Sequence, residues 1–246
     1  IFKVMNTIFI TGATSGIGLA CVKMYLDNNN FVIGVGRNNK RLNYIKKNLY
    51  NAKKNFLGIK CDLENKNAIK IIVKKISKFK KIDTLINCAG LSRKNKIENI
   101  SLNEWNKIMH INVTIPYMLS QKFLNKLSKS KNASIINVSS IAGRLRSISL
   151  GCHYTTSKSA IIGMTRHLAA ELSKKKIRVN CCAPSQTVTP MLKKSLSIQG
   201  QKKLIQNIPL NRLSNANEQA EVIYFLSSKK SSYVNGAIID VNGGQL

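Results

Sequence analysis

Short apolar runs alternate with longer amphipathic stretches from one end of the chain to the other. The short runs predict strands at Thr7–Thr11, Phe31–Val35, Phe56–Cys61, Thr84–Asn87, Ser134–Val138, Arg178–Ala183 and Ala237–Val241. Apolar positions at helical spacing predict helices at Gly16–Leu26, Leu42–Leu49, Ala68–Phe79, Leu102–Leu127, Tyr154–Ser173 and Asn217–Ser227. The polar, lysine-rich segment Thr187–Arg212 interrupts the alternation and is assigned no element.

This alternation predicts an α/β fold. Strands that return through helices form a parallel sheet, and right-handed crossovers place helices on both of its faces. We therefore expect a single doubly wound domain of the Rossmann type over residues 1–246, with a sheet of about seven strands. No internal repeat or proline-rich linker divides the chain. In such folds the ligand site lies beyond the carboxyl ends of the strands.

The hydropathy of the chain is typical of a globular protein. Hydrophobic residues make up 43% of the sequence, and no run reaches the ~18 apolar residues that would indicate a membrane span. The first residues, Ile1 to Thr7, lead directly into an apolar strand, without the charged start and small-residue cleavage site of a signal peptide. We expect a cytoplasmic protein with no membrane partner.

The net charge of +30 is the most unusual property of the composition. Such a charge can attract nucleic acid, anionic lipid or an acidic protein. The basic residues are mostly lysines, spread over the whole length together with many asparagines and isoleucines. That distribution indicates a compositional bias rather than a binding patch, so nucleic-acid binding is not expected.

Cysteines and histidines form no ligand pattern. The six cysteines are scattered and lack the C-x-x-C spacing of zinc sites. We interpret them as small buried thiols in a reducing compartment. His110, His153 and His167 are placed as neither a triad nor a metal set, and we interpret them as structural. No metal site is predicted.

A glycine-rich loop joins the first predicted strand to the first helix. It reads TGATSGIG over residues 11–18. Gly12 permits the tight turn, Gly16 lets backbone amides approach a pyrophosphate, and Gly18 lets the helix pack closely on the sheet. The helix N-terminus adds unpaired N–H donors and partial positive charge. The loop predicts dinucleotide binding.

The end of the second strand indicates which dinucleotide is bound. NAD sites usually place a carboxylate there for the ribose hydroxyls. Residues 36–41 read GRNNKR and contain no carboxylate. Arg37 can fork onto a 2′-phosphate, assisted by Lys40 or Arg41. The pattern favours NADP(H) over NAD(H), although a solvated basic loop would look the same.

Tyr154 and Lys158 lie four residues apart at the start of a predicted helix, on one face. A nearby ammonium stabilises a phenolate and lowers the pKa of the phenol. Tyr154 is thus a candidate to exchange a proton with a carbonyl or alcohol while hydride moves to or from a nicotinamide. Ser140, at the end of the fifth strand, is placed to hydrogen-bond the substrate oxygen.

With these motifs the chain resembles the short-chain dehydrogenase/reductase family over nearly its full length. The matching segments are TGATSGIG (11–18), Asp62-Leu63, NCAG (87–90), Asn112, NVSSIAG (137–143), YTTSK (154–158), IRVNCCAPS (177–185) and VNGG (241–244). Their order and spacing together are highly specific.

The resemblance implies a role for each matching residue. Catalytic roles go to Ser140, chosen over Ser139 because it precedes the Ile-Ala-Gly segment, to Tyr154, to Lys158, and to Asn112, which would hold a water of a proton relay. The cofactor would be bound by Gly12, Thr14, Ser15, Gly16, Ile17, Gly18, Arg37, Asp62, Leu63, Asn87, Ala89, Gly90, Tyr154, Lys158, Pro184, Thr187 and Thr189. The family is commonly tetrameric and needs no metal.

The chain departs from the family pattern at four places. Cys88 replaces an asparagine, which puts a turn contact in doubt, and Ser185 replaces a glycine beside the nicotinamide. The spacing from Ser140 to Tyr154 is one residue longer than in the bacterial relatives. Ser15 stands where many NADP users carry a basic residue, so the NADP prediction depends on Arg37.

Within the family the chain most resembles the 3-oxoacyl-[acyl-carrier-protein] reductases of fatty acid biosynthesis. This resemblance implies NADPH-dependent reduction of a 3-oxoacyl thioester, with an acidic carrier protein as a partner and a homotetramer as the assembly. A sugar or other secondary-alcohol dehydrogenase is the alternative, and a non-catalytic basic RNA-binding protein is a remote one. The segment at about 187–212 is expected to form a substrate lid.

Overall fold

The computed structural model describes residues 5–195 and 197–246. Its centre is one parallel sheet of seven strands in the order β3-β2-β1-β4-β5-β6-β7. The strands are β1 (Thr7–Thr11), β2 (Phe31–Gly36), β3 (Phe56–Lys60), β4 (Thr84–Asn87), β5 (Ala133–Val138), β6 (Ile177–Pro184) and β7 (Ile238–Val241). The sheet confirms the predicted single Rossmann domain. Strand order reverses between β1 and β4, where doubly wound folds open a ligand crevice.

Helices cover both faces of the sheet. One face packs against α4 (Ala68–Lys75), α6 (Ile115–Leu127) and α7 (Cys152–Leu172), and the other against α1 (Gly16–Asp27), α2 (Asn39–Asn48) and α10 (Ala216–Ser227). A one-turn helix, α3 (Ala52–Asn55), precedes β3. In the first core Phe9 of β1 meets Phe123 of α6 edge to face, with ring centroids 4.7 Å apart.

The predicted helix over residues 102–127 is not continuous. It consists of α5 (Leu102–Met109), a π-helical turn (His110–Thr114) and α6. In this turn the amide of Ile115 donates to the carbonyl of His110, an i→i+5 bond. Apolar spacing alone does not reveal such a bulge, because it shifts the face by only one residue. The helix predicted over 68–79 was also too long, since α4 ends at Lys75.

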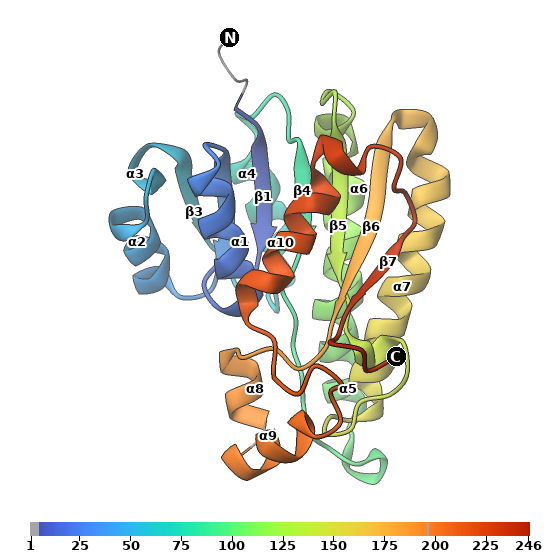
Figure 1. Cartoon of the computed structure of the whole chain (residues 1–246). Coiled ribbons are helices and arrows are strands. Elements are labelled where there is room, and N and C mark those ends of the chain that lie inside the picture. The colour runs from blue at the N-terminus through green and yellow to red at the C-terminus, as the bar shows by residue number, and fades with distance from the viewer. Residues whose placement is uncertain (1–4, 196) are drawn as a thin grey trace.

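The segment Thr187–Arg212, for which the sequence predicted no helix or strand, contains two helices, α8 (Pro190–Ser195) and α9 (Ile198–Ile205). Figure 1 shows α5, α8 and α9 together beyond the carboxyl ends of the strands, at the end of the molecule opposite the N-terminus. They lie where the ligand site was predicted. Within the described ranges, no helix is long and apolar enough to span a membrane.

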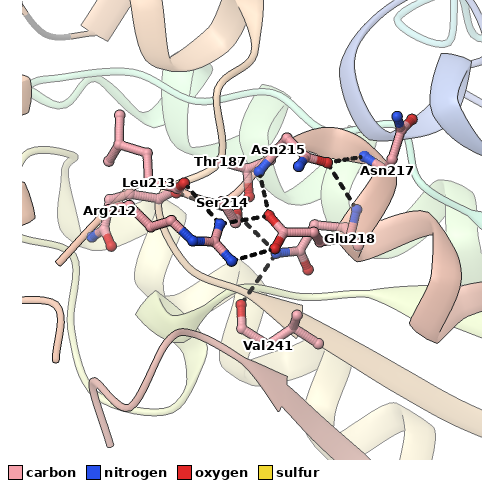
Figure 2. Close-up of polar contacts among 10 residues, drawn as sticks. Thr187, Arg212, Leu213, Ser214, Asn215, Asn217, Glu218 and Val241 are labelled. Carbon is pink, nitrogen blue, oxygen red and sulfur yellow. Dashed lines mark hydrogen bonds and ion pairs between the residues drawn. The ribbon is translucent and has the colours of Figure 1, made fainter. Parts of the chain in front are cut away.

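The two ends of this helical segment are joined at its base. Thr187 and Ser214 form an isolated parallel β-bridge, and their hydroxyls lie 2.8 Å apart. The buried amide of Gln219 donates to Ser214 Oγ at 3.0 Å and to the carbonyl of Val241 at 3.2 Å (Figure 2). The α8–α9 segment therefore begins and ends at the same place, the bridge between Thr187 and Ser214. The Gln219 side chain links this place to α10 and β7.

An ion pair reinforces this base. Both terminal guanidinium nitrogens of Arg212 donate to the Glu218 carboxylate, at 2.9 and 2.6 Å (Figure 2). The same carboxylate accepts from the backbone amide of Asn215, whose side chain caps α10 in return. These hydrogen bonds lower the pKa of Glu218 to about 2.

The depressed pKa of Glu218 predicts a pH-dependent contribution to stability. Since the folded state favours the carboxylate, the contribution is complete above the unfolded pKa of about 4.3 and disappears as pH falls towards 2. We expect the melting temperature of Glu218→Gln to lie below wild type at pH 7, and the difference to shrink by pH 3. Glu98→Gln is the control, because Glu98 is 60% exposed and 3.9 Å from Lys96. An equal effect of both substitutions, or a difference independent of pH, would contradict this account.

Candidate active site

A cavity of about 910 Å³ opens at the carboxyl edge of the sheet. Its walls are the glycine loop after β1, the loops after β4, β5 and β6, and residues of α8 and α9. Of the residues predicted to act in catalysis, Ser140, Tyr154 and Lys158 line it. The volume is in the range of sites that bind small molecules and cofactors.

The glycine loop has the conformation expected of a phosphate cradle. Gly12 has φ +70°, a left-handed conformation that costs other residues energy. A Cβ at Gly18 would overlap the carbonyl oxygen of Gly12, so only glycine allows this approach of helix to loop. Ser15 is the N-cap of α1, and its side chain makes no capping hydrogen bond. The N-terminus of α1 therefore faces the cavity without a side-chain acceptor, as an anion site requires.

The structure separates the two adjacent serines after β5. Ser139 is buried and donates to the backbone carbonyl of Lys158 at 2.7 Å. Ser140 lines the cavity, accepts from the amide of Ala142 at 3.1 Å, and hydrogen-bonds Tyr154. Ser139 thus holds β5 against α7, while Ser140 presents its hydroxyl beside the phenol.

Tyr154 and Lys158 lie on one face of α7, as their spacing predicted. Both are nearly buried, at 8% and 5% exposure. The ammonium of Lys158 donates to the carbonyl of Val138 at 2.9 Å and lies 5.7 Å from the centre of the Tyr154 ring. The carbonyl at the end of β5 therefore fixes the ammonium close to the phenol.

The expected lowering of the phenol pKa is not found. Burial raises the pKa of Tyr154, and the hydrogen bond from Ser140 offsets only part of the rise. Burial also lowers the pKa of Lys158. Both shifts have one physical cause, because a poorly solvated site disfavours the charged form of each group. The sequence argument considered the attraction between phenolate and ammonium but not the loss of water around them.

Asn112 lies in the π-helical turn, 1% exposed. Its amide nitrogen donates to the carbonyl of Leu91 and to the hydroxyl of Ser157, both at 2.9 Å, and its oxygen accepts from the amide of Leu91 at 2.8 Å. Asn112 thereby ties the loop after β4 to α7. The relay water assigned to Asn112 stays a prediction.

The residues after β4 keep their backbone contacts despite the substitution at Cys88. Thr11 Oγ1 accepts from the amides of Cys88 and Ala89, each at 3.0 Å. These hydrogen bonds hold the turn after β4 without involving the side chain of Cys88. The thiol of Cys88 lines the cavity, and burial raises its pKa to about 12. Asn87 donates to Asn137 Oδ1, and its own buried oxygen makes no hydrogen bond with any residue that the structure describes.

The predicted cofactor residues fall into two groups. Those that line the cavity are Gly12, Ser15, Gly16, Ile17, Gly18, Ala89, Gly90, Pro184, Thr187 and Thr189. Thr14, Arg37, Asp62, Leu63 and Asn87 lie outside it. Arg37 follows β2, and Asp62 and Leu63 follow β3, the two strands on one side of β1, where this fold usually places the adenosine of a dinucleotide.

Sequence reasoning missed two residues on this adenosine side. Glu64 lies 3.6 Å from Arg37 and 2.6 Å from Lys107 of α5. Glu64 also holds the turn after β3, where its amide donates to Asp62 Oδ1 at 3.1 Å. The separation of 43 residues between Glu64 and Lys107 left no signal in the sequence.

One end of the cavity is mostly apolar. Ile141, Leu145, Ile148, Leu150, Met191, Leu192 and Leu204 line it, from the loop before α7 and from the α8–α9 segment. Leu145 and Ile148 are 60% and 63% exposed. Exposed aliphatic side chains around a cavity mark a surface that suits an apolar ligand.

Two of the three histidines make polar contacts with other elements, and the cysteines differ in exposure. His153 is buried and lies 2.8 Å from Glu104 Oε1, while His110 Nε2 lies 3.2 Å from the carbonyl of Leu63. All six cysteines are free, and Cys152 is exposed, contrary to the expectation of buried thiols. Among the described residues, no group of three or more histidine, cysteine, aspartate or glutamate side chains is arranged to hold a metal.

Comparisons with known proteins agree with this geometry. The family model described as short chain dehydrogenase matches residues 6–199. The chain is 33% identical over 236 residues to a 3-oxoacyl-[acyl-carrier-protein] reductase of Thermotoga maritima, covering 96% of this chain and 95% of that one. A relative of the same name from Buchnera aphidicola subsp. Acyrthosiphon pisum is 34% identical over 247 residues, covering 97% and 96%.

Solved structures agree as well. A 3-ketoacyl-(acyl-carrier-protein) reductase from Brucella melitensis, complexed with NADH, superposes with a TM-score of 0.88 at 28% identity and covers 99% of each chain. A 4-hydroxyisoleucine dehydrogenase complexed with NADH gives a TM-score of 0.89 at 28% identity, covering 98% of each. The protein therefore belongs to the short-chain dehydrogenase/reductase family and is an oxidoreductase of that kind.

Proposed function

We propose that the protein reduces a 3-oxoacyl thioester with NADPH. The observation that carries the proposal is the juxtaposition of Ser140, Tyr154 and Lys158 inside a largely apolar cavity next to the glycine loop. When bound, the nicotinamide cofactor supplies the hydride. Every other requirement of the reaction falls to side chains of this chain.

The cradle residues fit such a cofactor. Gly12, Gly16 and Gly18 leave room for a pyrophosphate at the N-terminus of α1. Ser15 and Ile17 belong to the same loop, and Thr14 packs beneath it against Gly36. The remaining contacts would come from Asp62, Leu63, Asn87, Ala89, Gly90, Pro184, Thr187 and Thr189, as the resemblance implies.

Tyr154 acts in this proposal as the proton donor. Ser140 hydrogen-bonds the substrate carbonyl oxygen and holds it beside the phenol, whose proton passes to that oxygen as the C–H bond forms. The raised pKa keeps Tyr154 protonated at neutral pH, which suits reduction better than alcohol oxidation. Lys158 replenishes the proton and binds the ribose, and Asn112 holds the water through which Lys158 exchanges protons with solvent.

Arg37 supports the choice of NADPH. It follows β2 directly, no carboxylate occupies residues 36–41, and its side chain is 67% exposed. A guanidinium there can bind the 2′-phosphate that distinguishes the two cofactors. NADH is the cofactor in two solved structures of relatives, and that cofactor is a property of those proteins.

The apolar lining supports an acyl substrate over a sugar. Polyols need several polar partners, whereas aliphatic side chains such as Leu145, Ile148 and Leu204 suit an acyl chain. The α8–α9 segment would close over this chain as a lid and exclude water. The basic surface suits an acidic acyl carrier protein in the cytoplasm, and a homotetramer is the expected assembly.

A secondary-alcohol dehydrogenase is the second candidate. It is favoured by the similarity to the 4-hydroxyisoleucine dehydrogenase. A substrate panel that includes an acetoacetyl thioester, polyols and hydroxylated amino acids, assayed with NADPH and NADH, separates the two activities.

Tyr154→Phe tests the proton donor. We expect NADPH oxidation with an acetoacetyl thioester to fall at least about a hundredfold, because the phenol proton is lost while the ring still fills its place. NADPH binding, followed by fluorescence titration, should stay within about twofold of wild type. Tyr117→Phe, at an exposed position of α6, is the matched control and should retain full activity. Turnover by Tyr154→Phe near the wild-type rate would exclude the mechanism.

Arg37→Gln tests the cofactor preference. The substitution removes the guanidinium but keeps a polar side chain, so the ratio of kcat/KM for NADPH over NADH should fall about tenfold or more. The value for NADH should change little, because NADH carries no 2′-phosphate. Arg41→Gln, which alters the same basic segment, is the comparison. An unchanged ratio in Arg37→Gln would remove NADPH from the proposal.

A further inference from the structure

The geometry points to Lys107 as a specificity-determining residue for the 2′-phosphate of NADP(H), acting through Glu64. This inference rests on the proposed use of NADPH. Lys107 lies on α5, outside the glycine loop and outside the segment after β2, where cofactor preference is usually sought.

Glu64 links two cations. Its carboxylate lies 2.6 Å from the ammonium of Lys107 and 3.6 Å from the guanidinium of Arg37. The first distance is that of a close charge-assisted hydrogen bond, and the second is that of a looser ion pair. Lys107 is thus the main partner of the carboxylate, and Arg37 keeps N–H donors free for a further anion.

Lys107 acts on the 2′-phosphate site through the balance of charge around Glu64. The three side chains together carry one net positive charge. Without Lys107 the carboxylate would cancel Arg37, and a 2′-phosphate with a charge close to −2 would meet a neutral pair. Lys107 therefore keeps the positive charge of Arg37 available.

A second contact holds the same turn in place. His110, three residues after Lys107, lies with Nε2 3.2 Å from the carbonyl of Leu63. One face of α5 and the π-helical turn thus meets both Leu63 and Glu64. The turn after β3 is fixed relative to α5, and Glu64 with it. Glu64 is 29% exposed and Lys107 39%, so the pair is only partly screened by water.

The test measures dissociation constants for NADPH and NADH by fluorescence titration at low ionic strength. In Lys107→Met we expect the dissociation constant for NADPH to rise about five- to tenfold, while the dissociation constant for NADH stays within about twofold of wild type. Lys107→Arg should keep the wild-type preference. The double variant Glu64→Gln with Lys107→Met restores one net positive charge, so its NADPH affinity should return to within about twofold of wild type.

Lys96→Met is the matched control for total charge. Lys96 is 84% exposed and pairs only loosely with Glu98, at 3.9 Å. The same weakening of NADPH in both methionine variants, or no restoration in the double variant, would overturn the inference. An effect on NADH equal to that on NADPH would also overturn it, because it would indicate a merely structural role.

Arg37→Gln measured alongside separates this inference from the function on which it rests. If Arg37→Gln leaves the preference unchanged, the NADPH proposal itself fails. If Arg37→Gln lowers the preference and Lys107→Met does not, only the role of Lys107 is refuted.

Discussion

Burial of an ionisable pair at the carboxyl edge of the sheet is the constraint on which the site depends. Tyr154 and Lys158 lose most of their water because α7 packs against β5, and Ser139 and the Val138 carbonyl hold that packing together. Desolvation then raises the pKa of Tyr154 and lowers the pKa of Lys158, and both shifts favour the neutral form of the group. A neutral phenol is a proton donor at neutral pH, and this is the form that the proposed carbonyl reduction requires.

The two ends of the proposed dinucleotide site differ in what governs their interactions, which is burial at one end and the balance of charge at the other. At the nicotinamide end the walls are apolar, ionisable groups are buried, and polar contacts are few and fixed by the backbone. At the adenosine end Arg37, Glu64 and Lys107 are partly exposed, and their interactions depend on the balance of charge. The π-helical turn after α5 connects the two ends, because it carries Asn112 near Lys158 and follows the helical turn that carries Lys107.

Much of this could be predicted from sequence, because the relevant signals are local. All seven strands, the glycine loop and the Tyr154–Lys158 face follow from periodicity and short motifs. The preference for Ser140 over Ser139 was implied by the family resemblance, through the Ile-Ala-Gly segment that follows Ser140. What could not be predicted depends on distant contacts. The Glu64–Lys107 pair and the bridge from Thr187 to Ser214 join residues whose approach only the fold decides. The π-helical turn is local, but it leaves the apolar spacing of the helix almost unchanged. The direction of the Tyr154 pKa shift could not be predicted either, because it depends on burial, which is a property of the packed structure.

The net charge of +30 does not conflict with selectivity at one phosphate. A diffuse positive field attracts both cofactors, because both carry a pyrophosphate, and it attracts NADP(H) more strongly because of the added charge of the 2′-phosphate. The strongest discrimination comes from charges within about a Debye length of the 2′ position, roughly 8 Å at physiological salt. On the adenosine side the described ion pairs place one carboxylate between two cations. A carboxylate at this position therefore changes the local balance of charge even in a chain with four times as many basic as acidic residues.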